Sequence, residues 1–258
     1  LLMAYLHEWT PGMSSIQLQD FESGDPVTLD LNPEKNAVQN AQAFYKRHQK
    51  LRRTRDAVMP LLEEVEAELH YLEQVEAALS QTAAYRDPDD LSALEEIRDE
   101  LVQQSYVDDP YQRQTKHSGR GRSEKLPNFY KCQTPDGTEV WVGRNNNQNE
   151  ALSFKAANDY DLWLHTQEIP GSHVLLRLEP GAKASDDDLA FAANVAAWFS
   201  RARQSEQVPV VFTKPKHVYK PKGARPGMVI YKHEQVLWGQ PQKAKDYLEE
   251  EGKGVLNS

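Results

Sequence analysis

PEKNAVQNAQAFYKRHQKLRRTRDAVMPLLEEVEAELHYLEQVEAALSQT, residues 33–82, contains no glycine and carries a heptad pattern. Ten of the thirteen positions that alternate in steps of four and three from 37 to 79 are apolar, which is the spacing of a coiled-coil seam. Asn32 is suited to cap a helix that has Pro33 at its first position. The pattern predicts one long coiled-coil helix over about residues 33–82, kinked or interrupted at Pro60 because proline lacks a backbone donor.

Shorter elements flank this helix and complete a predicted middle region over residues 1–109. Residues 14–30 alternate weakly around a Ser-Gly-Asp-Pro turn and predict a small hairpin. A second helix is expected over about 90–105, returning antiparallel along the first, and it is too short to cover the whole seam. Because the chain opens on the apolar run Leu1–Leu6, we expect it to be the back part of a longer protein. The preceding segment is the first candidate to cover the rest of the seam.

The second half of the chain has a different composition. Residues 110–126 combine glycine, proline and basic residues, which predicts a flexible basic linker. Between 127 and 240, short alternating segments predict strands, and Ser185 followed by three aspartates predicts the start of a helix. A polar tail is expected over 241–258. The predicted fold class is α+β, a long helical coiled-coil arm followed by a small mixed α/β domain.

Charge divides the chain in the same way. The 258 residues carry a net charge of −9, but residues 1–109 hold 9 Lys and Arg against 22 Asp and Glu, whereas residues 110–233 hold 18 against 12. Only the second half is therefore expected to attract phosphate. No secretory leader or membrane span is recognisable, and Cys132, the only cysteine, cannot form an internal disulfide. These features predict a cytoplasmic location with no membrane partner.

The strongest functional signal is a basic loop, defined here as residues 213–227. It carries five basic residues and no acid: Lys214, Lys216, Lys220, Lys222 and Arg225. Its prolines favour an extended backbone, and Tyr219 stands among the charges. Such a loop is suited to following a phosphate backbone and to stacking on a base. The alternative is a solvated basic loop with no partner.

Asp161, His165 and His173 form a second candidate group. Asp161 and His165 share one face of a predicted strand because side chains alternate, and a Pro-Gly turn can return His173 beside His165. Two imidazoles and a carboxylate are able to bind a metal or perform acid–base chemistry. The spacing matches no metal motif, however, so we favour histidines that hold the turn by hydrogen bonds or donate to phosphate.

A run of amides starts another predicted helix. Residues 143–149 read GRNNNQN, and amides at a helix N-terminus can cap it while its N–H groups hold an anion. Capping explains one asparagine but not the four amides that follow it. We therefore include Arg144 and Asn145 among the candidate RNA contacts.

Three stretches together resemble the RNA-binding domain of the NFACT family of ribosome quality-control factors. They are VGRN with QN over 142–149, DLWLHTQ with IPGSHV over 161–174, and KPKGA with PG over 220–227. Residues 31–46, with LNP, NAQ and YK, also resemble the start of the family's middle coiled coil. The resemblance covers most of the chain and corresponds to the C-terminal part of a family member.

This resemblance implies a role on the ribosome. Family members bind the large ribosomal subunit, both rRNA and protein, when peptidyl-tRNA obstructs it, and they recruit tRNA for mRNA-independent tailing, with alanine in bacterial members. The resemblance implies that the chain lacks the family's N-terminal domain, which would itself be a partner. Peptide-bond formation belongs to the ribosome, so no catalytic residue, cofactor or metal is expected. The implied RNA contacts are Arg144, Asn145, His165, His173, Lys214, Lys216, Lys220, Lys222 and Arg225.

Two other functions compete with this one. A metal-dependent hydrolase or nuclease would use Asp161, His165 and His173. An adhesin or other protein-interaction module would work through the coiled coil alone, and some bacterial family members have been labelled fibronectin-binding proteins. The sequence leaves open which amino acid is added, which RNA the basic loop contacts, and whether the isolated arm dimerises.

Overall fold

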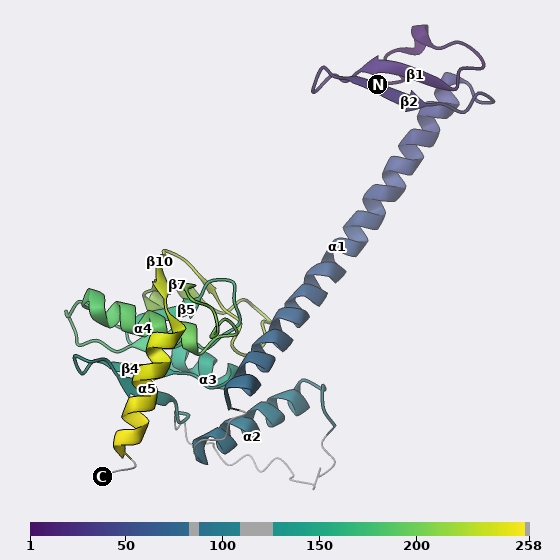
Figure 1. The fold of residues 1–258 in the computed structure, drawn as a ribbon. Helices are drawn as coiled ribbons and strands as arrows, with labels where there is room; N and C mark the ends of the chain where they lie inside the picture. The colour runs from purple at the N-terminus through teal and green to yellow at the C-terminus, as the bar shows by residue number, and fades with distance from the viewer. Residues whose placement is uncertain (83–87, 109–125, 256–258) are drawn as a thin grey trace. The chain divides into compact units, whose positions relative to one another are not determined.

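The structure is a computed structural model that describes residues 1–82, 88–108 and 126–255 (Figure 1). It is a mixed helical and sheet structure with one long helix, α1 (Ala37–Thr82). The chain divides inside this helix into two compact units, residues 1–67 and residues 68–258. They are called the N-terminal and the C-terminal unit below. The predicted linker over 110–126 lies almost wholly outside the described residues.

The N-terminal unit contains a short 3-10 helix, η1 (Leu6–Glu8), and a hairpin of β1 (Ser15–Gln19) with β2 (Pro26–Asp30). The two strands pair in antiparallel register at the position where the sequence predicts a hairpin. The side chains of Ile16 and Leu18 lie on one face of β1 and are buried. They pack with Leu2 and Leu31 in a small apolar cluster.

The long helix begins at Ala37, four residues later than the sequence suggested. Asn36 and Gln39 explain the shift, because each side chain accepts a hydrogen bond from the other's backbone N–H, at 2.8 and 3.0 Å. This reciprocal pair is a capping box, which satisfies two donors that a helix start leaves open. Asn40 is buried and its amide bonds to the backbone oxygens of Asn32 and Lys35, which ties the hairpin's exit to the helix.

Helix α1 continues through Pro60, so the predicted interruption does not occur. A proline removes one donor and leaves the other backbone bonds of this 46-residue helix available. The predicted seam remains exposed at all of its leucines and valines: Leu51, Val58, Leu62, Val65, Leu69, Leu72 and Leu79. Pairing of this seam in a coiled coil therefore stays a prediction.

Helix α2 (Pro88–Gln103) packs against another face of α1. Tyr71, Val75 and Ala78 form a buried cluster with Ile97 of α2. These three positions lie one residue before seam positions, a rotation of about 100° around the helix. Polar chemistry helps to select this face, because the buried hydroxyl of Tyr71 donates to Glu100 of α2 at 2.8 Å.

The rest of the C-terminal unit is built on a six-stranded sheet in the order β10-β7-β5-β6-β4-β3, with every neighbouring pair antiparallel. Its strands are β3 (Tyr130–Gln133), β4 (Glu139–Val142), β5 (Leu162–Thr166), β6 (Val174–Leu176), β7 (Val208–Thr213) and β10 (Gln235–Gly239). The helical elements are α3 (Asn146–Ala151), the π-helical η2 (Leu152–Ala156), α4 (Asp186–Trp198), the 3-10 helix η3 (Pro215–His217) and α5 (Pro241–Val255). A separate ribbon pairs β8 (Val218–Tyr219) with β9 (Ile230–Tyr231).

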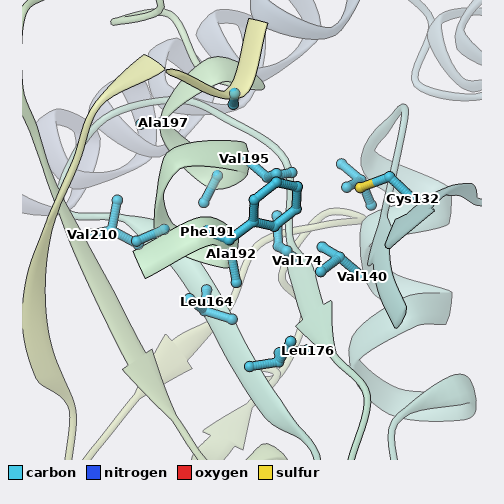
Figure 2. Packing of buried hydrophobic residues seen from close by; sticks show 14 of the residues in the cluster. Cys132, Val140, Leu164, Val174, Leu176, Phe191, Ala192, Val195, Ala197 and Val210 are labelled. Carbon is cyan, nitrogen blue, oxygen red and sulfur yellow. The ribbon is translucent and has the colours of Figure 1, made fainter. Parts of the chain in front are cut away.

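One face of the sheet is covered by α4 (Figure 2), which supplies Phe191, Ala192 and Val195 to a cluster with Val140 and Leu164. Cys132 is a buried member of the same cluster. Ser185 caps α4 as predicted, with its hydroxyl accepting from the backbone N–H of Asp188 at 3.0 Å. The segment predicted as a polar tail is α5, which adds Ala244, Tyr247 and Leu248 to this core.

The opposite face of the sheet carries a second buried cluster around Trp163, Leu175 and Val211. The basic loop reaches this cluster through Val218. The end of α1 is also fixed to the sheet domain, since Gln74 accepts from the backbone N–H of Gly171 at 3.0 Å. None of the helices in the described part of the chain is long and apolar enough to cross a membrane.

Candidate nucleic-acid interface

The basic loop leaves the sheet at the end of β7 and returns through β9. Its first turn is the 3-10 helix η3, and Val218 then anchors β8 in the second buried cluster. Gly223 and Gly227 both have φ of +77°, a conformation in which glycine avoids steric strain. A Cβ on Gly227 would also come within 3.0 Å of the side chain of Asn146. Val218 therefore anchors the loop in the core, while its four lysines are exposed.

The five predicted cations of this loop fall into two groups. Lys214, Lys216 and Lys222 are exposed, and none of them forms an ion pair with another described residue. Lys220 is different, because its ammonium lies 2.6 Å from a carboxylate oxygen of Glu150. Of the five, only Lys214, Lys216 and Lys222 thus present an uncompensated charge to an approaching phosphate.

Arg225 is held inside the C-terminal unit. Its guanidinium donates to the hydroxyl of Tyr106 and lies 3.7 Å from the carboxylate of Glu68. It also stands over the ring of Tyr71, 4.7 Å from the centroid, an arrangement in which the cation is attracted to the aromatic face. These contacts attach the loop to α1 and to the segment after α2, so in this structure Arg225 positions the loop.

Arg144 and Asn145 are buried against the acidic helix α2. The guanidinium of Arg144 donates to Asp90 at 3.1 Å, and its side chain is 8% exposed. The side-chain amide of Asn145 donates to Glu96 at 2.7 Å, and Gln148 donates to the same carboxylate at 2.9 Å. The amide run therefore has a tertiary role, which explains why it contains more amides than capping requires. RNA contact by these two residues stays a prediction and would require α2 to move.

A buried carboxylate completes this contact. Glu100 accepts hydrogen bonds from Asn146 at 3.0 Å and from Tyr71 at 2.8 Å. Burial raises the pKa of Glu100 above its ordinary value, although the hydrogen bonds from Asn146 and Tyr71 act in the opposite direction. The pKa of Tyr71 is also raised, chiefly by burial and then by the hydrogen bond to Glu100.

We expect Asn145→Ala to lower the free energy of unfolding of the C-terminal unit by about 1–2 kcal/mol. The substitution removes the side-chain oxygen that accepts from the backbone N–H of Gln148 at 2.9 Å, and it removes a donor to Glu96. Denaturant titration followed by circular dichroism would measure the change. Asn147→Ala is the matched control, since Asn147 is exposed in the same turn and should change stability by less than about 0.5 kcal/mol. Equal effects of the two variants would contradict the tertiary role of Asn145.

His165 and His173 are brought together, as the sequence predicted, but they are buried. Their ring centroids lie 5.3 Å apart, and both rings pack against Trp163. The hydroxyl of Ser153 lies 2.8 Å from Nδ1 of His173. Burial lowers the pKa of His165 to about 4 and that of His173 well below its ordinary value. Burial therefore favours the neutral form of both imidazoles, which offers no charge to phosphate. RNA contact by these two histidines stays a prediction.

Asp161 is occupied by internal partners. Its carboxylate accepts from the backbone N–H groups of Asn158 and Leu178 at 2.8 and 3.1 Å, and it forms an ion pair with Arg177 at 3.3 Å. Among the residues described, no three His, Cys, Asp or Glu side chains are grouped so as to hold a metal ion. The bonds of Asp161 join the segments before β5 and after β6. They give no support to a hydrolase that uses Asp161 with the two histidines.

The structure also adds residues that the sequence did not single out. His233 follows β9 and comes beside His217 of the basic loop, with ring centroids 4.6 Å apart. Lys232 stands 5.9 Å from the ring centroid of Tyr219. The only sequence signal for them is their basic character just after a predicted strand, which is too common to indicate a site.

The fold and the exposed lysines define a small antiparallel sheet domain with a cationic loop, attached to a long helix. Residues 1–120 match the family model described as NFACT N-terminal and middle domains, and residues 128–233 match the one described as NFACT protein RNA binding domain. The chain belongs to the NFACT family.

Relatives extend this similarity over nearly the whole chain. The Rqc2 homolog RqcH of Streptococcus suis is 34% identical over 247 residues, which is 95% of this chain and 42% of the relative. That of Bacillus subtilis is also 34% identical, over 93% of this chain and 40% of the relative. The chain therefore spans about two fifths of the length of these relatives. A solved structure, the C-terminal part of a fibronectin/fibrinogen-binding protein from Streptococcus suis, is 33% identical with a TM-score of 0.63, covering 82% of this chain and 80% of that one.

Proposed function

We propose that this chain is the arm and the RNA-contacting module of a ribosome quality-control factor. In this proposal it binds the large ribosomal subunit when peptidyl-tRNA obstructs it, and it helps to recruit tRNA for mRNA-independent alanine tailing of the stalled chain. The ribosome forms the peptide bonds, so the chain needs no catalytic residue. Support comes from the similarity to RqcH proteins and to the NFACT RNA-binding domain.

The observation that carries the proposal is the group of three exposed lysines on the basic loop. Lys214, Lys216 and Lys222 present charges without a described acidic partner on a loop that Val218 anchors in the core. Lysines that neutralise phosphates release the counterions held by a nucleic-acid backbone, which favours binding. We therefore assign the main RNA contacts to these three lysines. Lys220 and Arg225, which have internal partners, would contribute less.

The proposed arm is α1. Its heptad seam exposes seven leucines and valines along the helix, interrupted by Arg55 and Glu76. Pairing of that seam with a second helix would bury leucines that water now contacts, which is the driving force of coiled-coil formation. In the proposed function this paired helix reaches along the ribosome while the C-terminal unit contacts RNA.

Co-sedimentation with purified large ribosomal subunits tests this function. The loop variant carries Lys214→Glu, Lys216→Glu and Lys222→Glu, and the charge-matched control carries Lys183→Glu, Lys243→Glu and Lys245→Glu around α4 and α5. We expect the wild type and the control to pellet with the subunit at low salt and to be released as salt rises, and the loop variant to remain in the supernatant. Equal pelleting of all three proteins would exclude the basic loop as the contact. Failure of the wild type to pellet would contradict subunit binding by this part of the protein.

A second candidate function is adhesion to fibronectin. It is favoured by one observation, the similarity to a solved structure that is named for fibronectin and fibrinogen binding. Binding of the same three proteins to immobilised fibronectin separates the two functions. Saturable binding that the loop variant retains, together with no pelleting on ribosomal subunits, would favour adhesion.

A further inference from the structure

A pocket of about 330 Å³ lies at the end of the sheet, where β7 passes into the basic loop. Lys214, Lys216 and His217 line it from the loop side, and His233 lines it from the segment between β9 and β10. Phe212 contributes an apolar wall. Its volume is at the lower end of the range for small-ligand sites, so it matches one nucleotide unit better than a larger ligand.

Hydrogen bonds fix the two sides of this pocket to each other. The hydroxyl of Thr213 donates to the backbone oxygen of Lys232 at 2.9 Å, and the backbone N–H of Lys232 donates to the oxygen of His217 at 3.0 Å. His233 has φ of +55°, a conformation that residues other than glycine seldom adopt. The surrounding bonds hold this unfavourable conformation in place, and it sets the ring of His233 beside that of His217.

The charges in the pocket favour an anion. No acidic side chain lines it, and neither Lys214 nor Lys216 forms an ion pair with a described residue. Glu234 follows His233 in the sequence, but its side chain is exposed and is not part of the lining. Two imidazoles alone would suit a metal ion, but two ammonium groups beside them repel a cation. Imidazolium and ammonium groups together are donors to phosphate oxygens.

The titration of His217 agrees with this assignment. Removal from water, followed by the neighbouring charges of His233, Lys216 and Lys214, lowers the pKa of His217. An anion in the pocket would supply the opposite charge, and it would therefore raise the pKa of His217 and favour its protonated form.

We propose that this pocket binds one phosphate group of RNA, with Lys214 and Lys216 supplying charge and His217 and His233 donating hydrogen bonds. The inference rests on the proposed RNA-binding function and adds a defined phosphate site to it. Phe212 would form the apolar contact for the attached sugar. Lys222 lies outside the lining and would contact the RNA strand elsewhere.

The test is a titration of the full 258-residue chain, followed by NMR signals of the histidine rings. The probes are inorganic phosphate and a short single-stranded RNA, with and without a 5′ phosphate. We expect both His217 and His233 signals to shift, and the pKa of His217 to rise, while the exposed His48 does not respond. Between the raised pKa of His217 in the complex and its lower pKa in the free protein, RNA binding takes up one proton. In that range, the affinity for the RNA without a terminal phosphate should rise by up to about tenfold for each unit by which the pH is lowered.

The variants separate this inference from the proposed function. Lys214→Gln with Lys216→Gln removes the charges and should abolish the response of the His217 and His233 ring signals to phosphate. His217→Ala with His233→Ala removes the imidazoles and the reporting signals, so its effect is measured as weaker binding of the same RNA by fluorescence anisotropy. A shift only with the 5′-phosphorylated RNA would assign the site to a strand end, and a shift with both RNAs to an internal phosphate. Unmoved ring signals of His217 and His233 at saturating RNA would overturn the inference, even if the loop variant still failed to pellet with ribosomal subunits. Phosphate binding in the pocket without subunit binding would instead contradict the proposed function.

Discussion

Replacing Trp163 with alanine is expected to lower the free energy of unfolding of the C-terminal unit by about 3–5 kcal/mol. Trp163 is fully buried at the centre of the second apolar cluster, and its indole N–H donates to the hydroxyl of Ser153 at 2.9 Å. Its removal leaves a cavity and also deprives that hydroxyl, which contacts His173, of its donor. Such a loss is a large part of the 5–15 kcal/mol that typically stabilises a domain. Chemical denaturation followed by circular dichroism would measure it.

The sheet provides a matched control for this prediction. Trp238 lies on the edge strand β10 and is 63% exposed, so Trp238→Ala should change stability by less than about 0.5 kcal/mol. The prediction would be contradicted by comparable losses in the two variants, or by a Trp163→Ala protein as stable as the wild type. Because the basic loop is anchored in the same cluster through Val218, the Trp163 variant should also weaken RNA binding, whatever RNA is used.

Replacing Lys214, Lys216 and Lys222 with glutamine is expected to reduce the salt dependence of RNA binding. Each phosphate contact with single-stranded RNA contributes about 0.7 to the slope of log affinity against log salt, so the loss of three contacts should lower the slope by about 2. A fourfold fall in salt would then widen the affinity gap between wild type and variant by about 16-fold. Fluorescence anisotropy with a labelled single-stranded RNA over a series of salt concentrations would measure both slopes.

Two further variants serve as controls for this measurement of the salt slope. Glutamine at Lys183, Lys243 and Lys245 makes the same change in net charge away from the basic loop and should leave the slope unchanged. Lys220→Gln should change it less than any of the three exposed lysines, because Lys220 is already paired with Glu150 at 2.6 Å. An unchanged slope for the triple glutamine variant would mean that RNA, if it binds, does so elsewhere on the chain.

The local elements of this protein could be predicted from the sequence because each depends on residues close together in the chain. The hairpin at the N-terminus follows from alternation around a turn, and α4 follows from Ser185 and its three aspartates. The start of α1 could not be placed in the same way. Asn32 and Asn36 are both suitable caps, and the capping box between Asn36 and Gln39 decides between them.

The candidate site could be predicted only as a set of charges. The sequence located all five cations of the basic loop, but it treated Arg225 and Lys220 as equal to the other three. It also could not place α2, whose acids Asp90 and Glu96 cover Arg144 and Asn145. These acids are far from their partners along the chain, so no local pattern predicts the pairing.

By itself, the sequence determined the kinds of element, the acidic and basic halves of the chain, and the family to which it belongs. These properties depend on residue type and on spacing within one segment. Only the tertiary structure decided which charges remain free, which face of α1 receives α2, and that His233 stands beside His217. The physical reason is that burial and ion pairing depend on distance in space, and the chain path brings together residues from separate segments.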